Sequence, residues 1–424
     1  MSTPPPPPTV PFEAPSALAL LRVFRHRNYR LFFSGQLVSL MGTWMQSIAQ
    51  GWLVYALTHS PFLLGVTAFS GQVPVFFVTA FGGTIADRVD RRRMLIVTQS
   101  LAMTQAATLA ALTLTGVVKV EEVIGLALCM GLVNAFDIPT RQAFTVDMVG
   151  REDLRNAISL NSVMFNLARI VGPTAAGLLV AVAGEGVCFA INAFSYGAVL
   201  TSLLLIRVPP RPHRVPEHPL RELKAGALYA WNTHQIRNVL LLVAACAAFG
   251  ASYLAMMPAV ARDVLHQGSE GLGFLMGSVG LGALFGAYAL VRVPERLLTL
   301  MPVLAAASFG VSLVLFAHSH SLPLSMALLL PTSFSLMLLG GSTNTMIQTV
   351  AHDHFRGRVV SFYTMSFMGM MPWGSLVLGW TATHLGIGEA VTIGGAICVL
   401  AALAAYSARG GETELARADA VPGE

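Results

Sequence analysis

Charged residues are scarce in this chain. Asp, Glu, Lys and Arg make up 11% of its 424 residues, whereas apolar side chains make up 54%, and the mean hydropathy is +0.66. A soluble domain needs a polar shell to cover its core, and about a quarter of its residues are charged. The composition therefore excludes an ordinary soluble protein and indicates an integral membrane protein.

Cysteines are also few, and no pattern points to metal or redox chemistry. The chain has no CxxC spacing, and its four cysteines lie inside apolar segments: Cys129, Cys188, Cys246 and Cys398. We read them as small buried side chains and expect neither disulfides nor a metal site. The sequence also lacks a nucleophile with a placed base, a cluster of metal ligands and a phosphate-binding loop. We therefore expect neither an enzyme nor a bound cofactor.

Long apolar segments fill most of the chain. A bilayer core of roughly 30 Å needs about 20 helical residues for each crossing. We predict an all-α integral membrane protein with twelve transmembrane helices, at about residues 31–57, 62–86, 94–116, 121–144, 155–181, 186–206, 237–261, 270–291, 297–317, 322–350, 358–384 and 387–407. An interval rich in Pro, His and Arg divides these helices into two sets of six.

The expected organisation has five parts. Residues 1–27 form a disordered and juxtamembrane N-terminus that includes five consecutive prolines. Residues 28–206 form the first six-helix bundle, and residues 207–236 a cytoplasmic central loop. Residues 237–407 form the second six-helix bundle, followed by a disordered cytoplasmic tail at 408–424. A weak internal repeat between the halves fits a transporter built from two bundles with a site between them.

The Lys and Arg residues predict the orientation. On the side of the N-terminus lie 23 of the 26, the opposite side holds Lys119 and Arg262, and Arg169 lies inside a helix. Positive residues gather on the cytoplasmic side of membrane proteins. We therefore predict that both termini are cytoplasmic. Membrane orientation also explains the net charge of +5 better than nucleic-acid binding does.

One face of the first predicted helix is polar through much of the bilayer. Its members are spaced by three or four residues and so share one helical face: Gln36, Ser39, Thr43, Gln46 and Gln50. Such a stripe faces either a neighbouring helix, with which it forms hydrogen bonds, or a water-filled cavity. We favour cavity lining because the stripe has five members.

Further polar faces are predicted in later helices. Asn134, Asp137 and Arg141 share a face of the fourth helix, and Asn166 and Arg169 share a face of the fifth. Arg169 is expected beyond the bilayer midplane but still within the membrane, where an unpaired cation costs at least ~2.5 kcal/mol. A partner or a water-filled cavity is therefore implied. In the second half, Asn344 and Gln348 are the best candidates for cavity lining.

Asp137 is the one carboxylate that we place well inside a predicted helix. Two roles are open for it. In a cavity of low dielectric constant it would suit a proton carrier, whereas a fixed pair with Arg141 at i, i+4 would be structural. Asp137 is thus the candidate for proton coupling, and Arg141 joins the candidate cavity residues.

The loop after the second predicted helix resembles a family signature. Its residues match the G-x-x-x-D-R-x-x-R-R motif of the major facilitator superfamily, found in the cytoplasmic loop between its second and third helices: Gly83, Asp87, Arg88, Arg91 and Arg92. Residues 134–144, 151–161, 165–173 and 188–193 extend the resemblance to the transmembrane secretion effector branch, which includes enterobactin-exporter-like and macrolide-exporter-like proteins. Gly172, Pro173 and Gly177 resemble the helix 5 kink motif of antiporters, except that Ala176 replaces a glycine.

The resemblance implies a major facilitator fold and a secondary transporter in the cytoplasmic (inner) membrane. Export of a small amphipathic compound, drug-like or siderophore-like, would proceed by alternating access, driven by a proton gradient and without a cofactor. The signature loop would act as a conformational latch. The expected partners are the substrate and the lipid bilayer, with no nucleic acid and no obligate protein partner. A nutrient importer or uniporter of the same superfamily is the alternative, and a membrane-embedded enzyme or sensor is a remote one.

Overall fold

A computed structural model of the chain describes residues 21–86, 89–150, 152–208 and 219–418, and every regular element in these residues is a helix. Long helices suit a membrane because every backbone N–H and C=O within them is satisfied internally. The first half contains η1 (Arg22–Arg25), α2 (Arg27–Thr58), α3 (Pro61–Ala86), α4 (Arg91–Leu114), α5 (Val120–Val149), α6 (Leu154–Ala183) and α7 (Glu185–Leu205).

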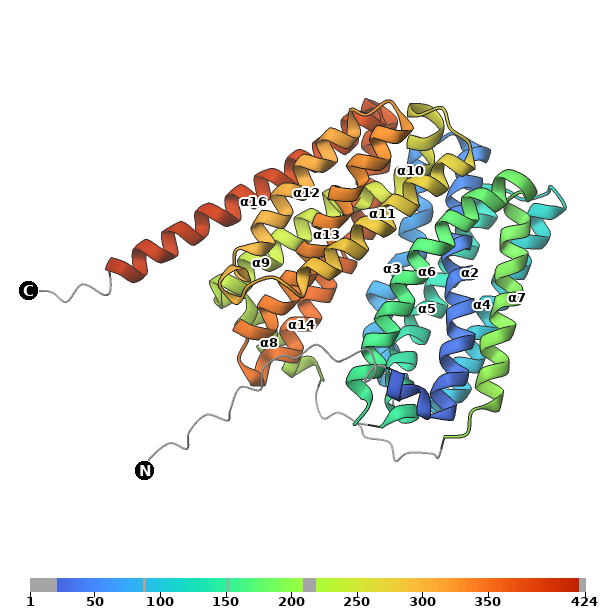
Figure 1. The fold of residues 1–424 in the computed structure, drawn as a ribbon, viewed down its shortest axis with the longest axis horizontal. Helices are drawn as coiled ribbons and strands as arrows, with labels where there is room; N and C mark the ends of the chain where they lie inside the picture. Colours follow the sequence, from blue (N-terminus) through green and yellow to red (C-terminus); the bar gives the residue numbers. More distant parts are fainter. Residues whose placement is uncertain (1–20, 87–88, 151, 209–218, 419–424) are drawn as a thin grey trace, which may run out of the picture.

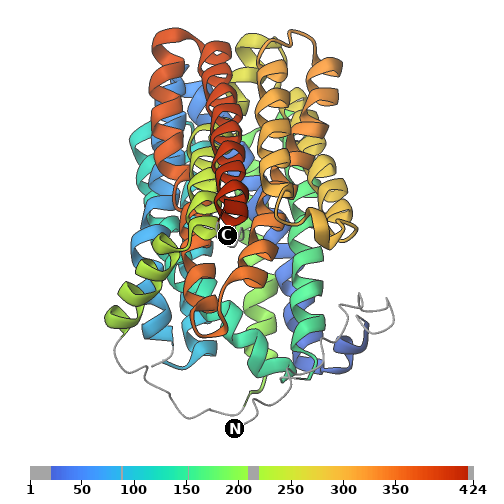
Figure 2. The same ribbon diagram turned by 90° about the vertical axis from the view of Figure 1, so that its left-hand side faces the viewer.

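The second half is more interrupted. It contains α8 (Pro219–Asn232), α9 (His234–Ala245), η2 (Cys246–Gly250), η3 (Ala251–Met256), α10 (Met257–Ala259), η4 (Val260–Val264), α11 (Ser269–Leu290), η5 (Glu295–Leu297), α12 (Met301–Ala317), α13 (Leu322–Val350), α14 (Asp353–Met368), α15 (Met371–Leu385) and α16 (Ile387–Ala418). Figure 1 shows the two halves as two helical bundles lying side by side, and Figure 2 shows the second half in front.

The helices carry the composition of membrane spans. In the described residues, nine helical stretches are long and apolar enough to cross a bilayer, and Met301–Ala317 is a shorter apolar helix. Large apolar side chains also stand on the surface, such as Val182 at 88% and Phe194 at 84% exposure. An apolar surface of this kind is suited to lipid. The described residues therefore have the all-helical architecture of a membrane protein.

Two of the predicted helices are broken. The segment expected as one helix at 237–261 is a succession of α9, η2, η3, α10 and η4, and that expected at 358–384 divides into α14 and α15. Pro258 and Pro372 lie at the starts of α10 and α15. Proline removes one backbone donor and clashes with the preceding turn, so a helix breaks at that point. Between residues 246 and 264 the chain forms short π-helical and 3-10-helical segments and the three-residue α10 in place of a continuous α-helix.

Two intervals expected to be irregular are helical. The central interval 207–236 contains α8, which begins at Pro219, where proline's fixed φ suits a first helical turn. The tail expected from residue 408 instead continues α16 to Ala418, over a stretch rich in the helix formers Ala, Leu, Glu and Arg. Residues 1–20 lie outside the described part of the chain, as do 209–218 and 419–424.

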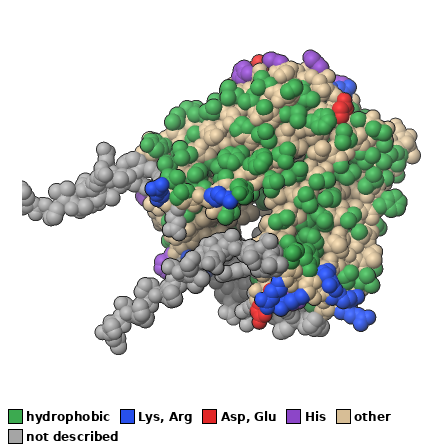
Figure 3. Space-filling view, in the orientation of Figure 1, with side chains coloured by type: hydrophobic (Ala, Val, Ile, Leu, Met, Phe, Trp, Pro, Cys, Tyr) green, Lys and Arg blue, Asp and Glu red, His purple; other side chains and the backbone are tan. Residues whose placement is uncertain are grey.

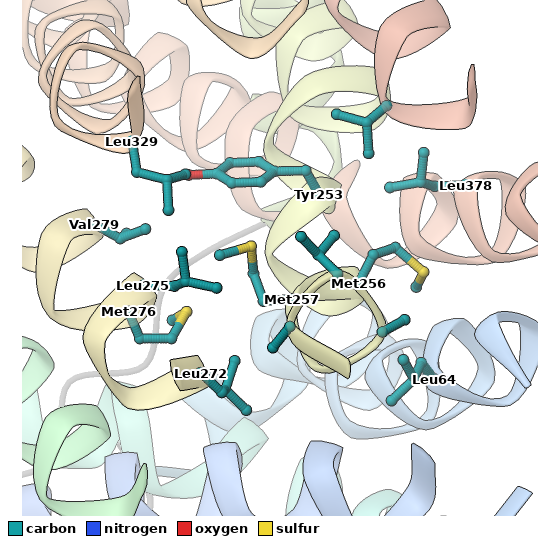
Figure 4. Close-up of a cluster of buried hydrophobic side chains, with 14 of the residues drawn as sticks. Leu64, Tyr253, Met256, Met257, Leu272, Leu275, Met276, Val279, Leu329 and Leu378 are labelled. Atoms are coloured by element: carbon teal, nitrogen blue, oxygen red, sulfur yellow. The ribbon is translucent and has the colours of Figure 1, made fainter. Parts of the chain in front are cut away.

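The two bundles meet at close helix crossings. An added Cβ at Gly177 in α6 would stand 2.5 Å from the Cα of Gly273 in α11. One at Gly65 in α3 would stand 2.3 Å from the carbonyl oxygen of Ser375 in α15. Glycine permits such backbone approaches, which are typical of helices that associate in membranes. The largest buried apolar cluster also spans both halves. Figure 4 shows part of it, with Leu64 from the first half and Tyr253, Met256 and Leu329 from the second.

Candidate functional site

A cavity of about 300 Å³ lies between the bundles. The first bundle contributes a wall with amide and hydroxyl groups: Thr43, Gln46, Ser47 and Gln50 from α2, Thr67 and Gln72 from α3, and Asn134 from α5. The second bundle contributes an apolar wall: Leu254, Ala255, Met257, Pro258 and Leu272. The polar lining side chains thus all come from the first bundle, which also contributes apolar ones such as Leu64 and Met130, whereas the second bundle contributes only apolar side chains.

The polar stripe of α2 divides into two parts. Thr43, Gln46 and Gln50 line the cavity. Gln36 and Ser39 do not line it, and both are buried, at 3% and 2% exposure. Their part of α2 lies tightly against α7, because Gly35 and Gly42 bring the two helices together. One part of the stripe therefore lines the cavity, and the other part packs against a neighbouring helix.

Gln46 connects the cavity to a network among α2, α4 and α7. Its side-chain nitrogen donates to Gln105 Oε1 at 2.9 Å, and its oxygen accepts from Asn192 Nδ2 at 2.7 Å. Ser195 donates in turn to Asn192 Oδ1 at 3.0 Å. Buried amides need such partners, and a fully connected network fixes their orientation. The polar wall is therefore held rigidly at Gln46.

Asp137 lies beneath the cavity, at 1% exposure. One oxygen accepts from Thr98 Oγ1 at 2.8 Å and Gln99 Nε2 at 2.7 Å, and the other accepts from Arg141. A buried carboxylate is tolerated when it is paired and its lone pairs are satisfied. This geometry suits the structural role. Asp137 does not line the cavity, although Asn134, less than one turn away on α5, does.

The remaining cavity candidates lie outside this cavity. Asn166 donates to the backbone oxygen of Ser162 within α6 at 2.8 Å. On α13, the amide nitrogen of Gln348 donates to Asn344 Oδ1 at 3.2 Å. Asn344 is half-buried and Gln348 is exposed. The structure therefore does not bring these three together with Gln46 and Gln50.

Arg169 has two buried head-group atoms without a partner among the described residues. Its Nε and Nη2 atoms are inaccessible to solvent and form no hydrogen bond in the described part of the chain. The same is true of the hydroxyl of Tyr253 in η3. Arg169 does not line the 300 Å³ cavity.

The signature loop is described only in part. Gly83 lies near the end of α3, whereas Asp87 and Arg88 lie outside the described residues. Arg91 pairs with Asp147 of α5 at 3.1 Å. Arg92 donates to the carbonyl oxygens of Leu203 at 2.6 Å and Leu204 at 2.9 Å, at the end of α7. These contacts join α4, α5 and α7, which all belong to the first bundle.

The predicted kink motif takes part in helix packing. Gly172 and Pro173 lie within a continuous α6, and Pro173 does not end the helix. An added Cβ at Gly172 would stand 2.7 Å from Trp44 Cβ of α2, and Gly177 meets α11 as described above. The motif therefore sets α6 closely against one helix of its own bundle and one of the other.

Some lining residues were not predicted. Thr67 and Gln72 are polar residues in the very apolar α3, but they lie five residues apart, so the spacing of three or four residues used for α2 does not connect them. The apolar wall carries no such signal, because Leu254, Met257 and Leu272 look like any core or lipid-facing residue. Leu254 and Met257 belong to the broken segment at 246–264, and Leu272 belongs to α11.

Comparison with known proteins places the chain in a family. A model of the transmembrane secretion effector family matches residues 17–422. The staphyloferrin A transporter of Staphylococcus aureus is 27% identical over 377 residues, which cover 87% of this chain and 94% of that protein. The multidrug efflux pump Tap of Mycolicibacterium fortuitum is 26% identical over 359 residues, covering 82% of this chain and 87% of that protein.

Solved structures agree on the fold. The crystal structure of a bacterial homologue of the human lysosomal transporter Spinster, inward-facing and occupied, superposes with a TM-score of 0.70. The superposed residues cover 91% of this chain and 97% of the Spinster homologue, and 14% of them are identical. At this level of identity the likeness concerns the fold alone. From the family match, the chain belongs to the transmembrane secretion effector family of the major facilitator superfamily, and it is a multi-pass membrane transporter rather than an enzyme.

Proposed function

We propose that this protein exports a small amphipathic organic compound, drug-like or siderophore-like, across the cytoplasmic membrane in exchange for protons. The observation that carries the proposal is the two-sided cavity, with amides and hydroxyls on the first bundle and apolar side chains on the second. Pockets of this composition bind ligands that have an apolar body and a few polar groups. The relatives that carry siderophore-transporter and drug-pump names support export.

The proposed topology has twelve crossings with both termini in the cytoplasm. Support for the twelve comes from adding α2, α12 and the α14–α15 pair to the nine apolar stretches. Support for the orientation comes from the distribution of charge. Figure 3 shows most Lys and Arg toward the lower end of both halves, one beside an acidic residue at the upper right, and His mainly at the upper end. By the positive-inside rule the lower end is cytoplasmic.

Alternating access would rock one bundle against the other around the cavity. In the proposed orientation, the glycine crossings of α3 with α15 and of α6 with α11 close the outer ends, because Gly65 and Gly177 lie near outer turns. The signature loop would act as a latch at the inner ends. Arg91 and Arg92 brace α4 against α5 and α7, so this latch would work by keeping the first bundle rigid as it moves.

Asp137 is the proposed site of proton coupling. It is the one carboxylate in the described apolar spans that lies more than two turns from a helix end. Protonation would remove the charge that holds Arg141, and the released guanidinium would change the packing beneath Asn134 and the polar wall. Exchange of a proton for substrate requires such a link between a titratable group and the cavity.

Transport in inverted vesicles tests the function. A screen of drugs and siderophores in an efflux-deficient host first identifies a compound to which expression gives resistance. That compound is then offered to inverted vesicles with an acid interior. Accumulation on acidification is expected for proton-driven export, whereas accumulation in intact cells with an inward gradient would show an importer and contradict the proposal.

A cavity-filling variant ties the result to the site. Ala68→Trp places a large ring in the cavity and should abolish resistance. Val182→Trp adds the same ring on the lipid-facing side of α6, where the native side chain is 88% exposed, and should leave resistance unchanged. Equal transport by both variants would show that this cavity is not the substrate path.

A further inference from the structure

The membrane interior of this protein carries an unbalanced positive charge. In the nine described apolar spans, three charged residues lie more than two turns from either end: Asp137, Arg141 and Arg169. Asp137 and Arg141 form an ion pair, so their charges cancel. Arg169 has no acidic partner among the described residues. The net charge at this depth is therefore +1.

Arg169 lies at the middle of α6, as the sixteenth residue of the 30 between Leu154 and Ala183. A guanidinium stays protonated in proteins, so burial does not remove its charge. A cation at the bilayer centre costs at least ~2.5 kcal/mol unless water or an anion compensates it. An anion that arrives during transport would supply this compensation.

The helical geometry directs Arg169 inward. At about 100° per residue, Arg169 lies about 60° from Gly172, which packs on α2, and about 100° from Ile170, which packs on α11. Arg169 thus falls in the sector between the faces toward α2 and α11. It is also on the opposite side of α6 from the exposed residues Leu167 and Val171. The side chain therefore faces the interface between the bundles and not the lipid.

The unpaired atoms form one edge of the guanidinium. Nε and Nη2 lie on the same side of the planar group, and their hydrogens point in parallel. This is one of the two edges that a carboxylate engages with both oxygens. Tyr253 of the second bundle also has a buried hydroxyl without a partner in the described part of the chain, but this hydroxyl points toward Leu329 of its own bundle (Figure 4). The anion-binding edge therefore belongs to Arg169 alone.

We propose that Arg169 is an anion subsite of the transport path and binds a carboxylate on the substrate through Nε and Nη2. This inference rests on the proposed export function and narrows its substrate class to amphipathic acids. Arg169 does not line the 300 Å³ cavity and its Nε and Nη2 are closed off from solvent, so the carboxylate would bind when the bundles move apart during transport. A bound carboxylate would cancel the +1 charge, so the loaded carrier would cross its conformational barrier with a neutral interior.

Binding of a matched pair of probes tests the inference. The purified full-length protein in lipid nanodiscs is titrated with 2-naphthylacetate and with its neutral isostere 2-naphthylacetamide, by isothermal calorimetry. The wild type should bind the carboxylate at least tenfold more tightly than the amide. Arg169→Gln should lose this preference while its affinity for the amide stays unchanged. Arg169→Lys keeps the positive charge but loses the two parallel N–H donors of the guanidinium. Its preference for the carboxylate should lie between those of the wild type and Arg169→Gln.

Arg262→Gln is the matched control, since it removes an arginine near the end of η4, and it should keep the wild-type preference. Monodisperse elution and an unchanged melting temperature without probe show that each variant is folded. Equal affinity of the wild type for both probes would overturn the inference, and so would an equal loss of both affinities in Arg169→Gln. In a different outcome, the wild type prefers the carboxylate probe and yet accumulates no compound in inverted vesicles. That result would contradict the export proposal but would still support Arg169 as an anion subsite.

Discussion

The hydroxyl of Tyr55 in α2 donates a hydrogen bond to the carboxylate of Asp263 in η4, and this bond joins the first bundle to the second. Both residues lie near helix ends that, in the proposed orientation, face outward. The crossing of Gly177 with Gly273 lies in the same half of the molecule. A polar bridge and a close-packed crossing thus act together to hold the outer ends closed.

Replacing Tyr55 by phenylalanine should weaken this closure. A hydrogen bond to a charged group contributes about 1.5–3 kcal/mol, and about 1.4 kcal/mol corresponds to a tenfold change in an equilibrium. If the bond is broken on opening, Tyr55→Phe should raise the outward-open fraction by roughly 10- to 100-fold. Labelling of an engineered Ala255→Cys in the cavity by an impermeant maleimide added from outside measures this fraction, with Cys129 replaced by serine to lower the background.

Tyr406→Phe is the control, because Tyr406 is 60% exposed and lies on α16. Its labelling rate should match that of the parent. A Tyr55→Phe variant that labels no faster than the Tyr406→Phe control would show that the bond to Asp263 does not restrain the outer ends.

The α6–α11 crossing should not tolerate a side chain. Gly177→Val places atoms where the backbone of Gly273 lies, and overpacking of this kind costs about 1–3 kcal/mol. A lower melting temperature in detergent and slower transport are expected. Gly197→Val in α7 is the matched control, since no atom lies within 4 Å of an added Cβ there. Equal melting temperatures for the two variants would refute close packing at Gly177.

Much of the helical plan follows from the sequence, because lipid forces apolar residues into long helices whatever their detailed neighbours. The breaks were harder to predict. Pro258 and Pro372 gave a local signal, but the π-helical and 3-10-helical segments around Tyr253 depend on packing against neighbouring helices. The helix α8 was missed because its Pro- and Arg-rich surroundings resemble a loop, and its Pro219 is at a first-turn position that proline favours.

The candidate site was predictable only on its polar side. A spacing of three or four residues identified Thr43, Gln46 and Gln50, because polar groups in lipid need a reason to be there. The same spacing could not reveal that Gln36 and Ser39 are buried where α2 packs on α7, since that depends on which helix lies opposite. Tertiary contacts, and not periodicity, decide between a packed and a hydrated stripe.

Low pH should loosen the N-terminal segment. Asp153, at the start of α6, accepts from His26 Nε2 at 2.8 Å and pairs with Arg25 at 2.8 Å. The hydrogen bond from His26, followed by the charge of Arg25, holds the pKa of Asp153 below its usual value. A lowered pKa gives stability that is present above the unfolded value of about 3.9 and is lost as the pH falls through the folded value.

Melting curves across pH check this. Above pH 5, the wild type should melt at a higher temperature than Asp153→Asn. Below about pH 4 the margin should shrink, because the wild type loses its charge and the variant has none to lose. Glu152→Gln, at a neighbouring exposed position, should follow the wild type throughout. A margin that stays constant down to pH 2 would show that the Asp153 charge is not responsible.

Asp137→Asn separates the two roles of the buried pair. If Asp137 carries the coupling proton, the variant should fail to accumulate substrate in response to a pH gradient but should still exchange internal for external substrate, because exchange needs no net proton movement. Its melting temperature should fall, since removing one partner of a buried pair costs about 3–5 kcal/mol by leaving the other charge unpaired.

The double variant Asp137→Asn with Arg141→Gln distinguishes a stability defect from a coupling defect. Removing both charges eliminates the unpaired cation, so the melting temperature should recover most of what the single variant loses. Recovery of pH-driven accumulation together with stability would mean that the pair is structural and that another group carries the proton. Recovered stability with accumulation still absent, and exchange intact, is the outcome expected for Asp137 as the coupling residue, because the proton site is missing in a correctly folded protein.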